Sequence, residues 1–306
     1  IILKSDGFPT YHLAVVADDH FMEISHIMRA EEWLPSTPRH LQLFDALGFE
    51  PPQFAHLPMI LGPDRSKLSK RHGATAVSEY RDKGFLPDSL INFMVLLGWS
   101  LDDKTEIMTL DTIMENFTLD RVTKSAAIFD QEKLEWMSGM YIREMSAKEL
   151  AGNMLPFLER DLPKELVPVD RDYLETIAPL IQERIKLMET AADSTSYFFE
   201  DQPEYDLSTL IQKGMEHQQT LDALKSALVT LNGASSFNHE SLEESLRATG
   251  TEIGVSPRQF FGAIRTAVTG RTATPPLFEM MEVLGRERVL RRMEWAVEHL
   301  AGANPV

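Results

Sequence analysis

The chain has 306 residues and carries 30 lysines and arginines against 47 aspartates and glutamates, a formal net charge of −17. Its hydrophobic content of 43% is typical of a globular protein, and its length allows roughly two domains. The acidity argues against indiscriminate nucleic-acid binding, although average charge does not exclude a local basic surface. The absence of cysteine excludes disulfides and thiolate metal sites and is consistent with a reducing, cytoplasmic environment.

The sequence gives little evidence for a membrane-spanning segment or a signal peptide. The longest apolar run, residues 91–99, contains Asn92 and is far shorter than the roughly 20 residues that cross a bilayer. The first residues lack the charged-then-apolar order of a signal peptide. Because the sequence begins abruptly and without Met, we expect it to be a fragment.

The first 65 residues alternate helix and strand signals. A helix capped by Thr10 is predicted to run to about residue 20, and alternating apolar residues predict a strand over residues 22–30. A second helix, capped by Thr37, is followed by a second strand over residues 56–61. Helix, strand, helix and strand in this order indicate part of a parallel, doubly wound sheet.

After about residue 74 the sequence predicts helices almost throughout. Ser146 and Glu149 form a Ser-x-x-Glu capping box, and Ser241 with Glu244 repeats the pattern. No internal repeat is visible. The second part of the chain is therefore expected to form compact helical bundles.

A short basic segment stands out in this acidic chain. Residues 65–73, RSKLSKRHG, carry four cations and one histidine without a single acid. Lysine ammonium groups suit a phosphate whose charge changes during a reaction. The segment lacks the glycines of a Gly-x-x-x-x-Gly-Lys phosphate loop. Taken alone, it could equally be a solvated basic turn.

The surroundings of this segment carry a family resemblance. KLSKR, residues 67–71, resembles the Lys-Met-Ser-Lys-Ser signature of class I aminoacyl-tRNA synthetases. DGFPTYHLAVVADDH and IMRAEEWLPSTPRHLQLFDALG before it, and GFLPDSLINFMVLLGWS, FDQEKLEWMSGMYIRE and TPPLFEMMEVLG after it, resemble bacterial glutamyl-tRNA synthetases in the same order. The resemblance covers nearly the whole chain. It implies a glutamate–tRNA ligase, which uses ATP to make glutamyl-adenylate and transfers glutamate to the 3′ end of tRNA(Glu).

The same resemblance implies a mostly α-helical architecture in four parts. Residues 1–73 would be the second half of a Rossmann-type catalytic domain that ends in the KLSKR loop, and residues 74–145 a helical stem-contact domain. Residues 146–216 and 217–306 would be two helical anticodon-binding subdomains. The His-Ile-Gly-His-type signature of class I synthetases does not occur in this sequence. We therefore expect the first half of the nucleotide fold to be missing and the chain alone to be inactive.

The resemblance also assigns site residues one by one. The catalytic residues would be Lys70, which steadies the departing pyrophosphate, and Lys67. The residues at ATP would be Glu32, Trp33, Ile60, Lys67, Leu68, Ser69, Lys70 and Arg71. Those at glutamate would be Tyr11, Arg29 and Val15, which stands where some relatives have asparagine. Those at the tRNA anticodon would be Arg184 on a helix, Arg265, Thr274, Pro275 and Leu277.

Packing offers another explanation for several of these residues. Trp33 and Ile60 could simply belong to the core, and Arg29 could pair with Glu31 or Glu32. The clustered histidines His12, His20 and His26 are expected to be structural rather than metal ligands. Magnesium is implied by ATP chemistry without an identifiable ligand, and no zinc site is expected.

Arginines gather again near the C-terminus. Residues 257–293 contain seven arginines, three glutamates and no lysine. Arginine suits contacts to phosphates and base edges. For residues 286–292 a solvated helical face is the simpler interpretation.

Two other functions remain open: a non-catalytic module that binds only the anticodon, and a helical scaffold without an RNA partner. The KLSKR and RAEEW segments argue against the first, and the arginines of residues 257–293 argue against the second. A steep salt dependence of tRNA binding would exclude the scaffold. The resemblance implies a monomer, and whether the enzyme also charges tRNA(Gln) is left open.

Overall fold

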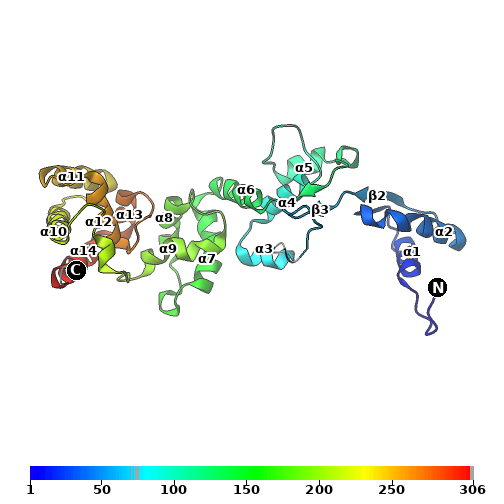
Figure 1. The fold of residues 1–306 in the computed structure, drawn as a ribbon, viewed down its shortest axis with the longest axis horizontal. Helices are drawn as coiled ribbons and strands as arrows, with labels where there is room; N and C mark the ends of the chain where they lie inside the picture. The colour runs from blue at the N-terminus through cyan, green and yellow to red at the C-terminus, as the bar shows by residue number, and fades with distance from the viewer. Residues whose placement is uncertain (70, 72, 74–75, 304–306) are drawn as a thin grey trace. The chain divides into compact units, whose positions relative to one another are not determined.

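The computed structural model describes residues 1–69, 71, 73 and 76–303 (Figure 1). It divides into two compact units, Ile1–Ser138 and Gly139–Val306. The fold is mostly helical, as predicted, with two short pairs of parallel strands. Within the described ranges, no helix combines the length and the apolar character that a membrane span needs. The expected domain boundaries at residues 74, 146 and 217 all stay predictions.

The first unit opens with the predicted alternation of helices and strands. In chain order these are α1 (Tyr11–Phe21), β1 (His26–Ala30), the 3-10 helix η1 (Glu31–Ser36), α2 (Thr37–Leu47) and β2 (Gln53–Leu57). β1 and β2 are parallel neighbours, and α1 packs against α2. Gly48 ends α2 with a φ of 70°, a conformation that glycine adopts without strain.

Two predicted strand boundaries are wrong. The strand predicted from residue 22 begins only at His26, because the amides of Met22 and Ile24 donate to the last carbonyls of α1, those of Asp18 and Asp19, at 2.8 and 2.9 Å. The strand predicted over residues 56–61 is interrupted at Pro58, whose nitrogen cannot donate to a ladder. Beyond that proline, β3 (Ile60–Leu61) leaves the first strand pair and joins β4 (Ala127–Ile128).

The rest of the first unit is helical. Its helices are α3 (Val77–Lys83), α4 (Pro87–Leu96), α5 (Leu110–Asn116), the 3-10 helix η3 (Leu119–Arg121) and α6 (Gln131–Arg143), which continues into the second unit. Trp99, Met108 and Ile113 form a small buried cluster beside α4. The Oδ1 of the buried Asn92 accepts a hydrogen bond from the Met108 amide at 2.9 Å.

The second unit is a helical assembly with one large apolar core. Its α-helices are α7 (Ala147–Asp161), α8 (Arg171–Ile181), α9 (Ala191–Phe199), α10 (His217–Gly233), α11 (His239–Glu252), α12 (Pro257–Thr269), α13 (Leu277–Leu284) and α14 (Arg286–Gly302). Short 3-10 helices lie between some of them: η4 (Lys164–Leu166), η5 (Met188–Thr190) and η6 (Leu207–Leu210). Buried side chains from α8 through α14 form the core, and α7 packs against α8.

The two predicted capping boxes have different outcomes. At α7 the box is confirmed: Glu149 Oε2 accepts from the Ser146 amide at 2.9 Å, and Ser146 Oγ accepts from the Glu149 amide at 3.3 Å. The box predicted at Ser241 and Glu244 is wrong. α11 begins earlier, because Asn238 is an equally good cap and accepts from the Ser241 amide at 3.0 Å.

The arginines of α14 do not form the solvated face that the sequence suggests. Arg292 is completely buried and donates to the carbonyls of Tyr197, Glu200 and Val268 at 2.6–2.7 Å, and to that of Asp201 at 3.3 Å. These carbonyls lie at the C-terminal ends of α9 and α12, where intrahelical donors run out. Burial lowers the pKa of Arg292 to about 10, so the guanidinium remains charged at neutral pH. Arg292 thus ties two helix ends to α14.

Two neighbouring arginines are used in the same way. Arg286 donates to the carbonyls of Asn232 and Ala234 at 2.6 and 2.7 Å, at the C-terminal end of α10. Arg288 donates to the Phe198 carbonyl and to the Tyr173 hydroxyl. Arg291 is exposed and faces Asp201 at 3.4 Å. Arg286 is exposed as well, but its guanidinium is bonded to the two carbonyls.

We predict that Arg292→Met lowers the free energy of unfolding of the chain by at least about 3 kcal/mol, because several buried carbonyls lose their donor together. Arg291→Met is the matched control on the next residue of the same helix, and it should change stability by less than about 0.5 kcal/mol. Urea unfolding followed by circular dichroism measures both. Equal effects of the two substitutions would contradict the anchoring role of Arg292.

Candidate functional site

Arg29 lies on β1 and is held by three acceptors that carry no charge. Its Nε donates to His56 Nε2 at 3.3 Å, its Nη1 to His40 Nδ1 at 3.1 Å, and its Nη2 to Thr37 Oγ1 at 2.9 Å. His56 is the direct register partner of Arg29 on β2, so the parallel strand pair itself brings the two side chains together. The alternative pairing of Arg29 with Glu31 or Glu32 is not among the ion pairs of the described residues.

The donor-only guanidinium fixes the histidine tautomers. His40 must offer a lone pair at Nδ1 and therefore carries its proton at Nε2, which donates to His12 Nδ1 at 2.9 Å. A neutral His12 then carries its proton at Nε2, which faces Arg39 Nη1, another donor, at 2.7 Å. Because Arg39 is exposed, this last contact is the one that can relax. His40 is thus held as a neutral acceptor for Arg29.

Both histidines around Arg29 resist protonation. Burial lowers the pKa of His40, and the charges of Arg29 and Arg39, and of His12 when it is protonated, lower it further. The pKa of His56 is lowered by burial and then by Arg29. Protonation of either ring would place a second cation beside Arg29 and remove one of its acceptors.

The Arg29 guanidinium has N–H donors without a partner among the described residues, and aromatic rings lie near it. Three of the five N–H donors of a guanidinium are used, which leaves two without a partner among the described residues. The rings of Trp33 and Phe54 lie 5.8 and 5.4 Å from its central carbon, and the Tyr11 ring lies 5.2 Å from that of Trp33. Val15 follows Tyr11 by one turn on α1. Tyr11, Arg29 and Trp33 therefore come together at a place that suits a carboxylate.

The KLSKR segment folds back onto β3. The Leu68 amide donates to the Ile60 carbonyl at 3.0 Å, and Leu61 forms an isolated bridge with Lys67. Lys67 Nζ lies 2.6 Å from Glu32 Oε2, so two of the residues expected at ATP are in contact. Both side chains are largely exposed, and such a pair adds little stability.

The remaining residues of the segment are described only in part. Arg71 donates to Ser66 Oγ at 2.7 Å and lies 3.6 Å from Asp64. Leu68 and Ser69 are half-buried. Lys70, the expected catalytic lysine, lies outside the described residues.

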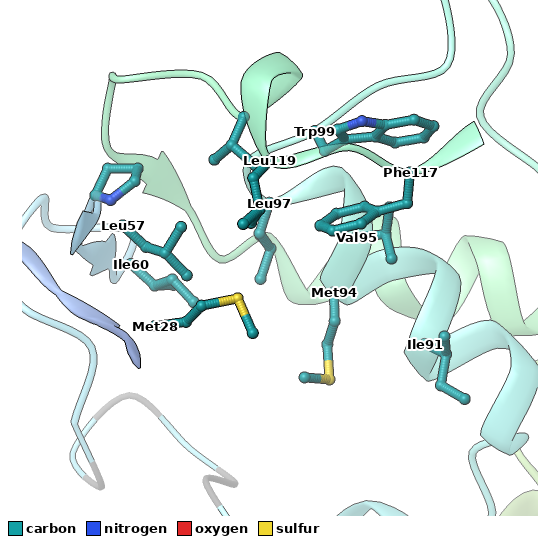
Figure 2. Close-up of a pocket in the computed structure, with 13 residues that line it drawn as sticks. Met28, Leu57, Ile60, Ile91, Met94, Val95, Leu97, Trp99, Phe117 and Leu119 are labelled. Carbon is teal, nitrogen blue, oxygen red and sulfur yellow. The ribbon is translucent and has the colours of Figure 1, made fainter. Parts of the chain in front are cut away.

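Ile60, one of the residues expected at ATP, lines an apolar groove. Figure 2 shows Met28, Leu57 and Ile60 on one side of this groove and Met94 and Phe117 on the other. The groove has a volume of about 370 Å³, and none of its lining residues is charged. Ile60 is 38% exposed, so it is not a fully packed core residue.

The second unit brings most of the expected anticodon residues to one small polar cavity. This cavity, of about 190 Å³, is lined by Ile181, Arg184, Asp193, Ser194, Tyr197, Arg271, Ala273, Thr274 and Pro275. Arg265 supports its wall from α12 and donates to Thr274 Oγ1 at 2.7 Å and to the Pro275 carbonyl at 3.0 Å. Burial lowers the pKa of Arg265 and the charge of Arg184 adds to this effect, so the two guanidinium groups are close enough to repel.

Arg184 and Leu277, both expected at the anticodon, have local surroundings that the sequence did not indicate. Arg184 does not lie on a helix: α8 ends at Ile181, and Arg184 lies in the following turn with its amide bonded to the Ile181 carbonyl at 2.8 Å. Leu277 is 4% exposed at the start of α13 and packs in the core.

Sequence reasoning did not single out Asp193, Tyr197 or Arg271 for this cavity. Arg271 Nη2 lies 3.3 Å from both Asp193 Oδ1 and Ser196 Oγ, and its guanidinium lies 5.5 Å from the Tyr197 ring centre. Asp193 and Tyr197 are four residues apart on α9 and thus share one face of the helix. This spacing of four residues is the sequence signal that could have identified Asp193 and Tyr197 together.

Within the part of the chain that the structure describes, no group of three or more His, Asp or Glu side chains could hold a metal ion.

The chain is similar to known proteins along nearly all its length. Residues 1–136 match the family of class I tRNA synthetases (E and Q), catalytic domain, and residues 149–297 match an anticodon-binding domain. A glutamate–tRNA ligase of Dehalococcoides mccartyi is 52% identical over 304 residues, which are 98% of this chain and 62% of that protein. One of Roseiflexus castenholzii is 45% identical and is covered over 61% of its length. The chain thus spans about three fifths of these relatives.

A solved structure extends the similarity to the fold. The crystal structure of a glutamate tRNA ligase from Elizabethkingia meningosepticum, in complex with its amino acid, matches with a TM-score of 0.82 at 31% identity. The match covers 98% of this chain and 62% of that one.

We predict that the first unit loses stability as the pH falls below the ordinary histidine value of 6.5. Because the folded pKa of His40 is lowered, the unfolded chain binds more protons between the folded value and 6.5. The contribution of a neutral His40 is therefore complete above pH 6.5 and decreases as the pH falls toward the folded value.

The prediction is checked by urea unfolding of the first unit between pH 8 and 5.5. His40→Gln keeps an acceptor but cannot titrate, so its pH dependence should be weaker than that of the wild type. His26→Gln alters an exposed ring that contacts Ser25 and should keep the wild-type dependence. Identical pH profiles for wild type and His40→Gln would refute the coupling to Arg29.

Proposed function

We propose that this chain, which belongs to the glutamate–tRNA ligase family of class I tRNA synthetases, takes part in charging tRNA(Glu) with glutamate. The observation that carries the proposal is the cavity in the second unit. Arg184, Thr274 and Pro275 line it and Arg265 supports its wall, although the four residues are spread over about 90 positions of sequence. A polar cavity of about 190 Å³ is smaller than the usual site for a drug-sized ligand and suits a single base.

The proposed reaction has two steps. The α-carboxylate of glutamate attacks the α-phosphorus of ATP, the bond to the β,γ-phosphates breaks, and pyrophosphate leaves. A hydroxyl at the 3′ end of tRNA then attacks the carbonyl of glutamyl-adenylate and releases AMP. Since the α-carboxylate must remain free to attack, the carboxylate held by Arg29 would be that of the glutamate side chain. Two spare N–H donors beside Tyr11 support this role for Arg29.

The KLSKR loop would stabilise the leaving phosphates. Negative charge grows on pyrophosphate as it departs, so a cation already in place favours the transition state over the ground state. In this proposal Lys70 and Lys67 supply that charge, and Glu32, Trp33, Ile60, Leu68, Ser69 and Arg71 lie around ATP. The contact of Lys67 with Glu32 supports a common site for these residues.

Magnesium would enter with the phosphates of ATP, and no side chain of this chain is assigned to it. We place the reaction in the cytoplasm and treat the chain as a monomer, in line with the absence of cysteine and with the proposed substrates. The proposed division is a half catalytic domain over residues 1–73, a stem-contact domain over 74–145, and anticodon-binding subdomains over 146–216 and 217–306.

We predict that Arg184 reads the third anticodon base. Glutamate anticodons end in cytosine and glutamine anticodons in guanine. Cytosine presents two acceptors, O2 and N3, to a guanidinium that can only donate, whereas the pairing edge of guanine presents N–H donors at N1 and N2. Opposed donors cost about 1–3 kcal/mol, so the chain should prefer a cytosine-ending stem-loop by about five- to hundredfold.

The measurement uses two anticodon stem-loop RNAs that differ only at this base. Arg184→Gln should reduce the preference, because a side-chain amide can donate or accept. Arg258→Gln removes an exposed arginine elsewhere in the second unit and should leave the ratio of the two Kd values unchanged. A wild-type chain without the preference, or an unchanged ratio in Arg184→Gln, would contradict the assignment.

A further inference from the structure

The side chain of Tyr197 is buried with its hydroxyl unsatisfied. The residue lies on α9 and is 1% exposed, and its hydroxyl has no hydrogen-bond partner among the described residues. Two other tyrosines of this unit differ. The Tyr205 hydroxyl donates to the Ala267 carbonyl at 3.2 Å, and the Tyr173 hydroxyl accepts from Arg288. Because buried polar groups are nearly always paired, the hydroxyl of Tyr197 calls for an explanation.

The surroundings of this hydroxyl point to the anticodon cavity. Tyr197 lines that cavity together with Arg184 and Arg271. Burial raises the pKa of Tyr197, while the charges of Arg271, Arg184 and Arg265 act in the opposite direction. The hydroxyl therefore keeps its proton at neutral pH, and it is a neutral donor and acceptor close to three groups that can only donate.

The Arg271 side chain can move away from Tyr197 at a small cost in free energy. The Arg271 guanidinium lies over the Tyr197 ring, and its contacts to Asp193 and Ser196 are both 3.3 Å long. The Asp193 side chain is 85% exposed, so this ion pair is weak in water. A phosphate of a bound RNA offers Arg271 a stronger partner. RNA binding can thus uncover the hydroxyl.

We propose that the Tyr197 hydroxyl is a binding residue for the base that enters this cavity and forms its hydrogen bond only in the RNA complex. The inference rests on the proposed function. When Arg184 donates to O2 and N3 of cytosine, the adjacent exocyclic amine still needs an acceptor. The Tyr197 oxygen supplies a neutral one, whereas Thr274 Oγ1 already accepts from Arg265.

Tyr197→Phe tests this directly, because it removes only the hydroxyl and keeps the ring. Two quantities are measured on the full chain: the free energy of unfolding without RNA, and the Kd for the cytosine-ending stem-loop. Stability should stay unchanged or rise, since an unsatisfied buried group is removed. The Kd should increase by about three- to tenfold, as expected for the loss of one hydrogen bond.

Tyr205→Phe is the matched control, and we expect it to change stability rather than RNA affinity. It removes a hydroxyl that is already bonded within the fold, so stability should fall while the Kd stays within about twofold. For Tyr197→Phe, an unchanged Kd, or a parallel loss of stability and affinity, would overturn the inference and leave the proposed function intact. A wild-type chain that binds a scrambled loop as tightly as the glutamate loop would overturn the proposed function and this inference with it.

Discussion

In both units, a guanidinium is held in place by neutral acceptors, which fix its position without an ion pair. Arg29 is positioned by two histidines and a threonine, Arg265 by a hydroxyl and backbone carbonyls, and Arg292 by backbone carbonyls alone. In a chain with a net charge of −17, carboxylates for these arginines would be easy to supply. Neutral acceptors instead fix the geometry without cancelling the charge.

The same constraint links the fold of the second unit to its candidate site. Arg292 binds the carbonyl of Tyr197, whose side chain lines the cavity, and the carbonyl of Val268, three residues after Arg265. The buried anchor that joins α9, α12 and α14 therefore also sets the distance between two walls of the site. In the first unit, the pairing register of β1 with β2 fixes the site geometry, because it places His56 opposite Arg29.

Much of the architecture could be predicted from local patterns, whereas the roles of single arginines could not. The helical content, the end of α2 at Gly48 and the capping box at Ser146 follow from short-range propensity. A helical pattern treats every arginine of α14 as polar and outward-facing. It cannot show that the carbonyl ends of two distant helices converge on Arg292. The residues expected at the anticodon were reached through family resemblance, while the role proposed for Tyr197 rests on a hydroxyl without a partner among the described residues.

The central claim is that the arginines around the cavity of the second unit, Arg184, Arg265 and Arg271, allow an acidic protein to bind RNA. It is tested most directly by measuring the Kd of the chain for tRNA(Glu) over a range of salt concentrations. Each phosphate contact contributes a slope of about −0.7 to −0.9 to a plot of log K against log salt, because counterions are released. The account predicts a steep slope that corresponds to several contacts. A slope near zero would contradict it.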